Sequence, residues 1–261
     1  MARKRSLYKP NSNEPHKLSW SRINNFHNCP RCFYLEETKG IKAPSGPQFL
    51  LNSAVDNLYK NEFDYYRKKE EPHPLMIKNN VSAIPYAHQD LDIWRDPFKG
   101  ISWHHEESNF IFHGGVDEIW INESKELHIV DYKSTSKKDF NPNFNSGYTA
   151  SYKKQLEFYQ WLFEKNGHKM SKVGFIVYAN GKKDEDMFDG KLHFDEYVFP
   201  IQLDTAWIEI SIKNILNCLN NTSLPKKGEG WNGAGCEQCN YKEKLADLMR
   251  QQRSNQEKIE A

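Results

Sequence analysis

Several kinds of segment are missing from this sequence of 261 residues. No apolar run approaches the roughly 20 residues that a helix needs to cross a bilayer. The basic N-terminus "MARKRSLYKPNSNEPHK" lacks the apolar stretch of a secretory signal peptide. No linker rich in Pro, Gly or Ser and no internal repeat divides the chain. We therefore expect a soluble cytoplasmic protein with one domain over residues 17–241, a flexible basic arm (1–16) before it and a charged helical tail (242–261) after it.

An excess of one sign of charge is also missing, because 36 Lys and Arg face 35 Asp and Glu. The whole molecule therefore carries no strong basic field, and the net charge does not by itself indicate nucleic acid as a partner. A local basic patch is still compatible with this balance. Aromatic residues make up 13% of the chain and include seven tryptophans, which is typical of a packed fold rather than a disordered chain.

Cysteine is scarce, but its placement is informative. Four of the five cysteines form two Cys-x-x-Cys pairs at opposite ends of the chain, Cys29/Cys32 and Cys236/Cys239. In a reducing cytosol such pairs predict metal ligands rather than disulfides. Four thiolates suffice for a tetrahedral Zn²⁺ or for a [4Fe–4S] cluster, and the spacing alone leaves both open. Either group would tie the two ends of the chain together, which is a structural role.

The hydrophobic periodicity predicts an α/β or α+β sandwich. Helices are expected at "SWSRINNF" with Ser19 or Ser21 as its cap, over about Pro47–Arg67, and at "SYKKQLEFYQWLFEKNG" and "DTAWIEISIKNILNCLNN". Strands are expected at "NFIFHGGVDEIWI", "ELHIVDYKST", "KVGFIVYAN" and "LHFDEYVFPIQL". The stretch from residue 72 to about residue 100 reads as irregular.

The first two of these strands carry acidic residues that an antiparallel hairpin would bring together. A register that places Ile119 opposite Ile129 gathers the apolar pairs on one face and sets Asp117 opposite Asp131, with Lys133 on the same face. Facing carboxylates destabilise a sheet unless they are compensated. Lys133 can neutralise one of them, and a divalent cation such as Mg²⁺ would neutralise both. The alternative is a solvated hairpin with a surface ion pair.

Three motifs in this order, "GGVDEIW", "VDYK" and "QLEFY", resemble the PD-(D/E)XK nuclease superfamily. Together with "CPRCFYL" and "CEQC", they look closest to RecB-type nuclease domains, which include AddB-like and CRISPR-associated iron–sulfur exonucleases. The resemblance implies a restriction-endonuclease-like core with a mixed central sheet flanked by helices, and chain ends joined at a cysteine metal site. It also implies a Mg²⁺- or Mn²⁺-dependent deoxyribonuclease in DNA repair, with DNA and a helicase or other recombination protein as partners.

The same resemblance implies roles for individual residues. Asp117 and Asp131 would hold one or two Mg²⁺ or Mn²⁺ ions with the backbone carbonyl of Tyr132, and Lys133 would orient the attacking water or stabilise charge on the phosphate. Gln155 and Tyr159 are four residues apart and share a helix face. They either reach toward this site or simply line an amphipathic helix.

Two departures from the pattern matter. Asp56 in "NSAVDNL" stands where RecB-type domains usually carry a metal-binding histidine, so it is either a metal ligand or a satisfied helix carboxylate. The branch favours a [4Fe–4S] cluster, but usually with one N-terminal and three C-terminal cysteines, whereas a two-plus-two arrangement also suits Zn²⁺. The second hypothesis is therefore a nuclease-fold module that binds nucleic acid or assembles with a partner without cleaving.

Overall fold

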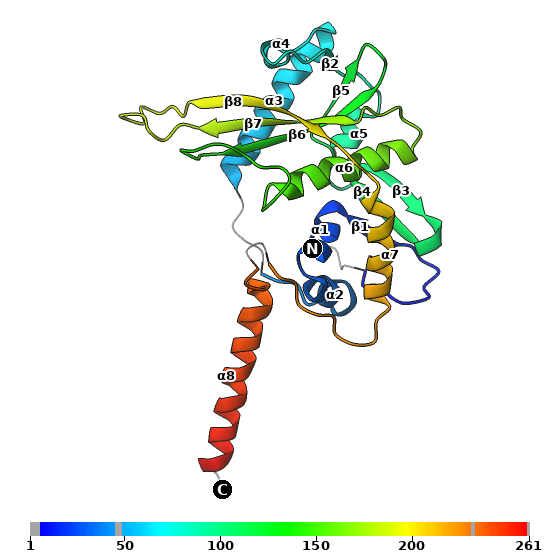
Figure 1. The fold of residues 1–261 in the computed structure, drawn as a ribbon, viewed down its shortest axis with the longest axis vertical. Coiled ribbons are helices and arrows are strands. Elements are labelled where there is room, and N and C mark those ends of the chain that lie inside the picture. Colours follow the sequence, from blue (N-terminus) through cyan, green and yellow to red (C-terminus); the bar gives the residue numbers. More distant parts are fainter. Residues whose placement is uncertain (1–5, 45–48, 231–232, 260–261) are drawn as a thin grey trace.

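A five-stranded mixed sheet forms the centre of the fold in the computed structural model, which describes residues 6–44, 49–230 and 233–259. Its strands, in spatial order, are β2 (Ala83–Pro85), β5 (Glu118–Asn122), β6 (Leu127–Thr135), β7 (Val173–Gly181) and β8 (Phe194–Gln202). Strands β6 and β7 are parallel, and the other neighbours are antiparallel. Helices lie on both faces (Figure 1), so the predicted mixed sheet flanked by helices is confirmed.

The hairpin of β5 and β6 has the register that its apolar residues predict. Ile119 pairs with Ile129 and Glu118 pairs with Val130, so the next position sets Asp117 opposite Asp131. Alternation fixes this register because a slip of one residue would turn every apolar side chain to the wrong face. Ile119 and Ile129 are both almost completely buried.

A second, three-stranded sheet is formed by β1 (His16–Ser19), β4 (Phe110–Gly114) and β3 (Ile101–His105), in that order. The prediction of one strand over "NFIFHGGVDEIWI" is therefore wrong, because this run divides into β4 and β5, which belong to different sheets. The break falls at two glycines. A Cβ on Gly114 would lie 2.6 Å from Cε1 of Tyr159, and one on Gly115 would lie 2.9 Å from the carbonyl oxygen of Asp96.

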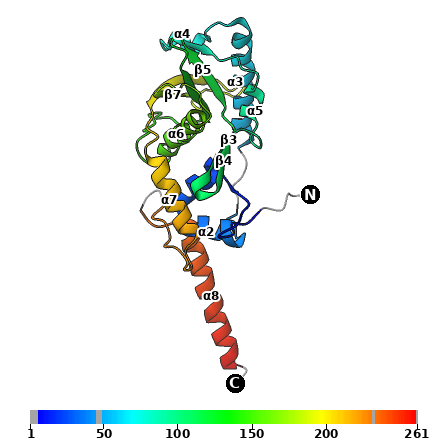
Figure 2. The same ribbon diagram turned by 90° about the vertical axis from the view of Figure 1, so that its right-hand side faces the viewer.

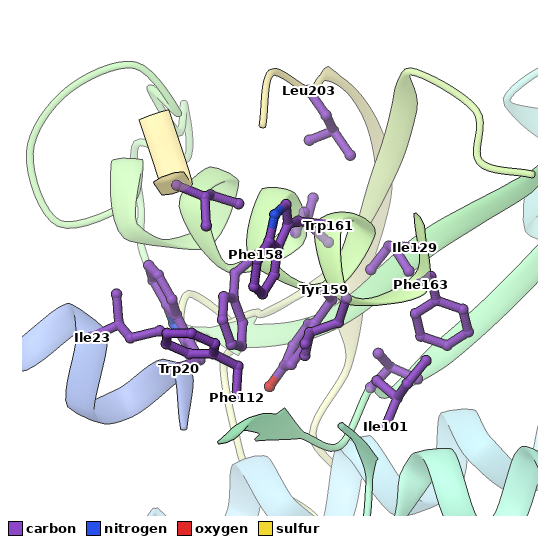
Figure 3. Packing of buried hydrophobic residues seen from close by; sticks show 14 of the residues in the cluster. Trp20, Ile23, Ile101, Phe112, Ile129, Phe158, Tyr159, Trp161, Phe163 and Leu203 are labelled. Atoms are coloured by element: carbon purple, nitrogen blue, oxygen red, sulfur yellow. The ribbon is translucent and has the colours of Figure 1, made fainter. Parts of the chain in front are cut away.

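Helix α6 (Ala150–Lys165) lies between the two sheets, in contact with β6 and with β3 and β4. Figure 3 shows its aromatic side chains packed against the N-terminal helix and the smaller sheet. The ring of Phe158 lies 5.9 Å from that of Trp20, and Trp161 meets Phe112 edge-on at 5.4 Å. Because α6 packs against both sheets, it carries aromatic residues on more than one side.

Helix α3 (Leu50–Lys69) covers the other face of the five-stranded sheet. Tyr59 stacks on Tyr132 of β6 with ring centroids 5.1 Å apart, and Phe63 stacks on Trp120 of β5 at 5.5 Å. These stacks set the rotation of α3 about its axis, which decides where its polar residues point. The expected start of this helix at Pro47 lies outside the described residues.

The remaining helices complete the layers. They are α1 (Trp20–Asn28), α2 (Pro30–Lys39), α4 (Pro74–Lys78), α5 (Leu91–Arg95), a 3₁₀ turn η1 (Glu106–Ser108), α7 (Trp207–Leu219) and α8 (Glu237–Ile259). The stretch predicted as irregular thus contains α4, β2 and α5, which are too short for a periodic signal. Ser19 is the N-cap of α1, but its hydroxyl contacts that of Ser21 instead of a helix N–H group.

The chain ends differ in how they contact the body. Tyr8 donates its N–H to the carbonyl of Glu37 and its hydroxyl to Asn220, both at 2.8 Å. Helix α8 projects away from the sheets in both views (Figures 1 and 2). Residues 1–5 of the predicted arm and 260–261 of the predicted tail lie outside the described residues, and the division into arm, domain and tail stays a prediction. None of the described helices is long and apolar enough to cross a membrane.

Candidate active site and cysteine cluster

The two aspartates of the hairpin end close to one another but in different environments. Asp117 directly precedes β5 and is partly exposed, and its Oδ2 accepts a hydrogen bond from the backbone N–H of Tyr132 at 3.0 Å. Asp131 lies within β6 and is only 2% exposed. One carboxylate therefore faces the surface and the other lies beneath it.

Lys133 is the ion-pair partner of Asp131 on the same face of β6. Burial raises the pKa of Asp131 to about 7, with the charge of Asp117 adding to the effect and that of Lys133 opposing it. Burial also opposes the charge on Lys133, but the carboxylates of Asp131 and Asp117 outweigh it and raise the pKa of the ammonium. A single lysine thus compensates two acids incompletely, as the sequence argument required.

A cavity of about 740 Å³ opens over this pair, between α3, β6 and the start of α6. Five of the predicted site residues share this cavity: Asp56, Asp117, Tyr132, Lys133 and Gln155. Asp131 and Tyr159 do not line it. They are buried below it, where they contact residues that do.

Helix α6 supplies Gln155 and Tyr159 from successive turns. Burial raises the pKa of the Tyr159 hydroxyl, the charges of Asp117 and Asp131 add to this, and a hydrogen bond with Gln155 opposes it. The ring lies against Gly114, where a larger residue would collide with it. Tyr159 therefore supports Gln155 from beneath. This helix face is packed and also reaches the cavity, and a role of the two residues at the site stays a prediction.

Asp56 enters the cavity from α3 and is paired with a lysine one turn later. Lys60 Nζ lies 2.8 Å from Oδ2 of Asp56 and 3.8 Å from Oδ1 of Asp117. Burial and the charge of Asp117 raise the pKa of Asp56, while Lys60 and Lys133 lower it. The predicted aspartate is thus at the site, and its nearest charged partner is an ammonium group.

Sequence reasoning missed several residues of this cavity. Lys60 follows Asp56 at i+4, a spacing that signals an ion pair. Asn52 donates to the carbonyl of Ser134 at 3.0 Å and so joins α3 to β6. Phe49, Tyr148 and Tyr152 contribute aromatic surface to the wall. Tyr152 precedes Gln155 and Tyr159 by three and seven residues, so helical periodicity could have found it.

Behind the site, Glu118 is completely buried in a charge network. It is bound by the guanidinium groups of Arg67 from α3 and Arg95 from α5, the latter at 2.5 Å, and accepts the hydroxyl of Tyr132 at 3.2 Å. Asp64 accepts from both arginines. The network clamps two helices onto the hairpin next to Asp117, so it fixes the position of the surface carboxylate.

The four paired cysteines meet where α2 and α8 begin, as predicted. Their Sγ atoms all lie within 4.8 Å of one another. Cys29 Sγ is 3.6 Å from that of Cys239, and Cys32 Sγ is 3.6 Å from that of Cys236 and 3.5 Å from that of Cys239. Among residues 6–44, 49–230 and 233–259, no other group of three or more His, Cys, Asp or Glu ligand atoms is as closely gathered.

The cysteines of this cluster differ in acidity because they hydrogen-bond to one another. The hydrogen bond with Cys29 raises the pKa of Cys32, and burial raises the pKa of Cys239 to about 11. A hydrogen bond from Cys32 is the main reason that the pKa of Cys29 falls to about 4, and the N–H of Gly228 at 3.2 Å from its Sγ adds to this. Cys29 also caps the N-terminus of α2. A thiolate is the form that ligates metals. Cys218 stands outside the cluster, and burial raises its pKa to about 11.

Comparison with known proteins gives a match to one family. A family model described as the PD-(D/E)XK nuclease superfamily matches residues 50–243, which include both hairpin aspartates and one cysteine pair. No curated protein matches the chain. The chain is similar to the crystal structure of SSO0001, at 16% identity over 82% of each chain and with a TM-score of 0.39. A similarity of that size supports no inference about the site.

Proposed function

Because the chain belongs to the PD-(D/E)XK nuclease superfamily, whose members are metal-dependent nucleases, we propose that the cavity over the hairpin is its active site and hydrolyses phosphodiester bonds in DNA. The observation that supports this best is the buried Asp131–Lys133 pair beside Asp117, at the floor of a cavity that can admit a phosphate. This is the arrangement that the motifs "GGVDEIW" and "VDYK" led us to expect.

The charges around the cavity fit a bound divalent cation. When all three are ionised, as ligation of a cation requires, Asp56, Asp117 and Asp131 carry three negative charges. Lys60 and Lys133 carry two positive charges, so one negative charge is left without a counter-charge in this partly buried site. Oxygen ligands of this kind are those that Mg²⁺ and Mn²⁺ prefer. Asp117 and Asp131, with the carbonyl of Tyr132, would hold the ion.

In this proposal each side chain has a distinct task. The bound ion would polarise the phosphate and acidify a water molecule. The N–H of Tyr132 holds the Asp117 carboxylate in its orientation. Lys133 opposes the rise in the pKa of buried Asp131 and, from the cavity wall, stabilises charge that develops on the phosphate. Gln155 contacts the substrate, and Tyr159 positions Gln155.

The aromatic wall favours nucleic acid as the substrate. Phe49 and Tyr148 are 74% and 61% exposed at the cavity, and Tyr148 meets Tyr152 edge-on at 5.4 Å. Exposed rings beside a site that binds the phosphate backbone are platforms on which unpaired bases stack. This supports a strand with unpaired bases next to the scissile phosphate.

For the cysteine cluster we propose zinc in preference to a [4Fe–4S] cluster. Four thiolates at about 2.3 Å from one zinc stand about 3.8 Å apart, whereas in a cubane each thiolate binds a different iron, so the thiolates stand further apart. The Sγ separations of 3.5–3.6 Å and the upper limit of 4.8 Å agree with the smaller tetrahedron. The role is structural, because the cluster joins Cys32 to Cys236 and Cys239, which follow it in the sequence by 204 and 207 residues.

The motif "CPRCFYL" places the chain, in this proposal, near the RecB-type branch. Nucleases of that branch act with helicases in DNA repair and recombination, and we extend the same class of partner to this protein.

The test is a cleavage assay with labelled single-stranded and double-stranded DNA and with RNA, in Mg²⁺, in Mn²⁺ and in EDTA. We expect cleavage of DNA that requires the metal and is lost in Lys133→Ala. Metal-independent binding of DNA with no cleavage under any condition would instead support the alternative, a nuclease-fold module that only binds nucleic acid or a partner.

A further inference from the structure

One ammonium group bridges two of the three carboxylates at the proposed active site. Lys60 Nζ lies 2.8 Å from Asp56 on its own helix and 3.8 Å from Asp117 at the start of β5. The three side chains are 23%, 28% and 26% exposed, so none of them is a freely solvated surface group. The bridge spans α3 and the hairpin.

The fold holds this bridge in place. Asp56 and Lys60 share a face because they are one helical turn apart. The neighbouring Tyr59 fixes the helix by stacking on Tyr132 and by donating its hydroxyl to Glu196 at 2.8 Å. The other lysine of the site, Lys133, is already paired with Asp131. Lys60 is therefore the ammonium group that pairs with Asp56, whereas Lys133 pairs with Asp131 and acts on Asp56 and Asp117 only through its charge.

We propose that Lys60 takes the place of a second metal ion, so that the site binds a single divalent cation at Asp117 and Asp131 and Asp56 anchors Lys60 instead of ligating metal. This inference rests on the proposed nuclease function. Lys60 is a positioning residue in it, since it acts on the carboxylates and not on the substrate.

The charge balance supports one ion. Three carboxylates and two ammonium groups leave one negative charge, which a single divalent ion converts to one positive charge. That matches the single negative charge of a phosphodiester. A second divalent ion would raise the surplus to three positive charges, and ions in this wall would repel Lys60 across a few ångströms.

Replacement of Lys60 by a neutral residue should therefore allow a second metal ion to bind. In Lys60→Met, Asp56 and Asp117 would face one another without a cation between them, which is the arrangement that a hard metal ion stabilises. Lys60→Arg keeps the positive charge and should still exclude the second metal ion. Lys68→Met, on an exposed part of the same helix, is the matched control.

The experiment counts Mn²⁺ ions bound per chain, by calorimetric titration and by the electron paramagnetic resonance of free Mn²⁺, on full-length protein with its cysteine metal retained. We expect one ion for wild type, Lys60→Arg and Lys68→Met, and two for Lys60→Met. Asp131→Asn should lower the affinity for the ion that the wild type binds at least tenfold. Circular dichroism confirms that each variant is folded.

Two results would overturn the inference: two Mn²⁺ ions in the wild type, or one ion in a folded Lys60→Met. Either of them, combined with DNA cleavage that depends on Asp131, would leave the proposed function standing. Wild-type protein that neither binds Mn²⁺ nor cleaves DNA would overturn both.

Discussion

The backbone N–H of Tyr132 donates a hydrogen bond to Oδ2 of Asp117 at 3.0 Å. Asp117 lies one residue beyond the last ladder pair of the hairpin, where backbone pairing no longer fixes it. This bond replaces the missing ladder contact and orients the carboxylate beside Asp131. The site is thereby organised by the hairpin itself, and neighbouring groups tune it.

The buried network behind Asp117 should be essential for stability. In Glu118→Gln the guanidinium groups of Arg67 and Arg95 lose their buried counter-charge. Breaking a buried ion pair by neutralising one partner costs about 3–5 kcal/mol. Urea unfolding should show a loss of that order. Glu126→Gln, at the exposed turn of the same hairpin, should change the midpoint little, and equal effects of the two variants would contradict the role of the network.

The cysteine cluster should contain one zinc ion per chain. Purified protein should be colourless, and replacement by Co²⁺ should give the visible bands of a tetrahedral thiolate site. Cys239→Ser should lose the metal and melt at a lower temperature, because the tie between the chain ends is lost. Cys218→Ser is the control, since Cys218 lies outside the cluster. Brown protein containing iron and acid-labile sulfide would contradict the zinc assignment.

His27 should make the fold sensitive to acid. Burial, with help from Lys154, lowers the pKa of this imidazole to about 4, against about 6.5 in an unfolded chain. The contribution of neutral His27 to the free energy of unfolding is complete above pH 6.5. It is lost as the pH falls toward 4, because in that window only the unfolded state takes up the proton. The stability difference between wild type and His27→Gln should therefore narrow by about 2 kcal/mol between pH 7.5 and 4.5. Urea unfolding at both pH values measures this, and a constant difference would contradict it.

Tyr148 should contribute to binding of unpaired bases. Stacking on an exposed ring is worth about 1–3 kcal/mol per base, so Tyr148→Ala should weaken binding of single-stranded DNA by roughly five-fold to a hundred-fold. Fluorescence anisotropy in the Asp131→Asn background measures binding without cleavage. Tyr65→Ala removes an exposed ring of α3 that does not line the cavity. An equal loss of affinity for single-stranded DNA in both variants would contradict a specific role of Tyr148 in base stacking.

The sequence predicted the hairpin and the cysteine cluster because each depends on a local rule. Alternating apolar residues allow only one register, in which Ile119 meets Ile129. Two Cys-x-x-Cys pairs can be satisfied together only if the chain ends meet, and they do. Both features follow from period and spacing, which a single sequence displays.

The features that were missed depend on contacts between distant segments. Gly114 and Gly115 end one strand because Tyr159 and the backbone of Asp96 approach them, which no local pattern reveals. Glu118 looks like one polar residue in an apolar strand, and its partners lie 51 and 23 residues away. The position of Lys60 between two acids depends likewise on how α3 rests on the sheet.

The decisive measurement is the single-turnover rate of Mg²⁺-dependent DNA cleavage by Asp131→Asn beside that of Asp139→Asn, which changes an exposed aspartate outside the cavity. Loss of a charge that acts directly on the reaction costs about 10²–10³-fold or more. We predict a loss of at least this size for Asp131→Asn in a folded protein, with Asp139→Asn close to wild type. Cleavage by Asp131→Asn at the wild-type rate would show that the hairpin aspartates are not the active site.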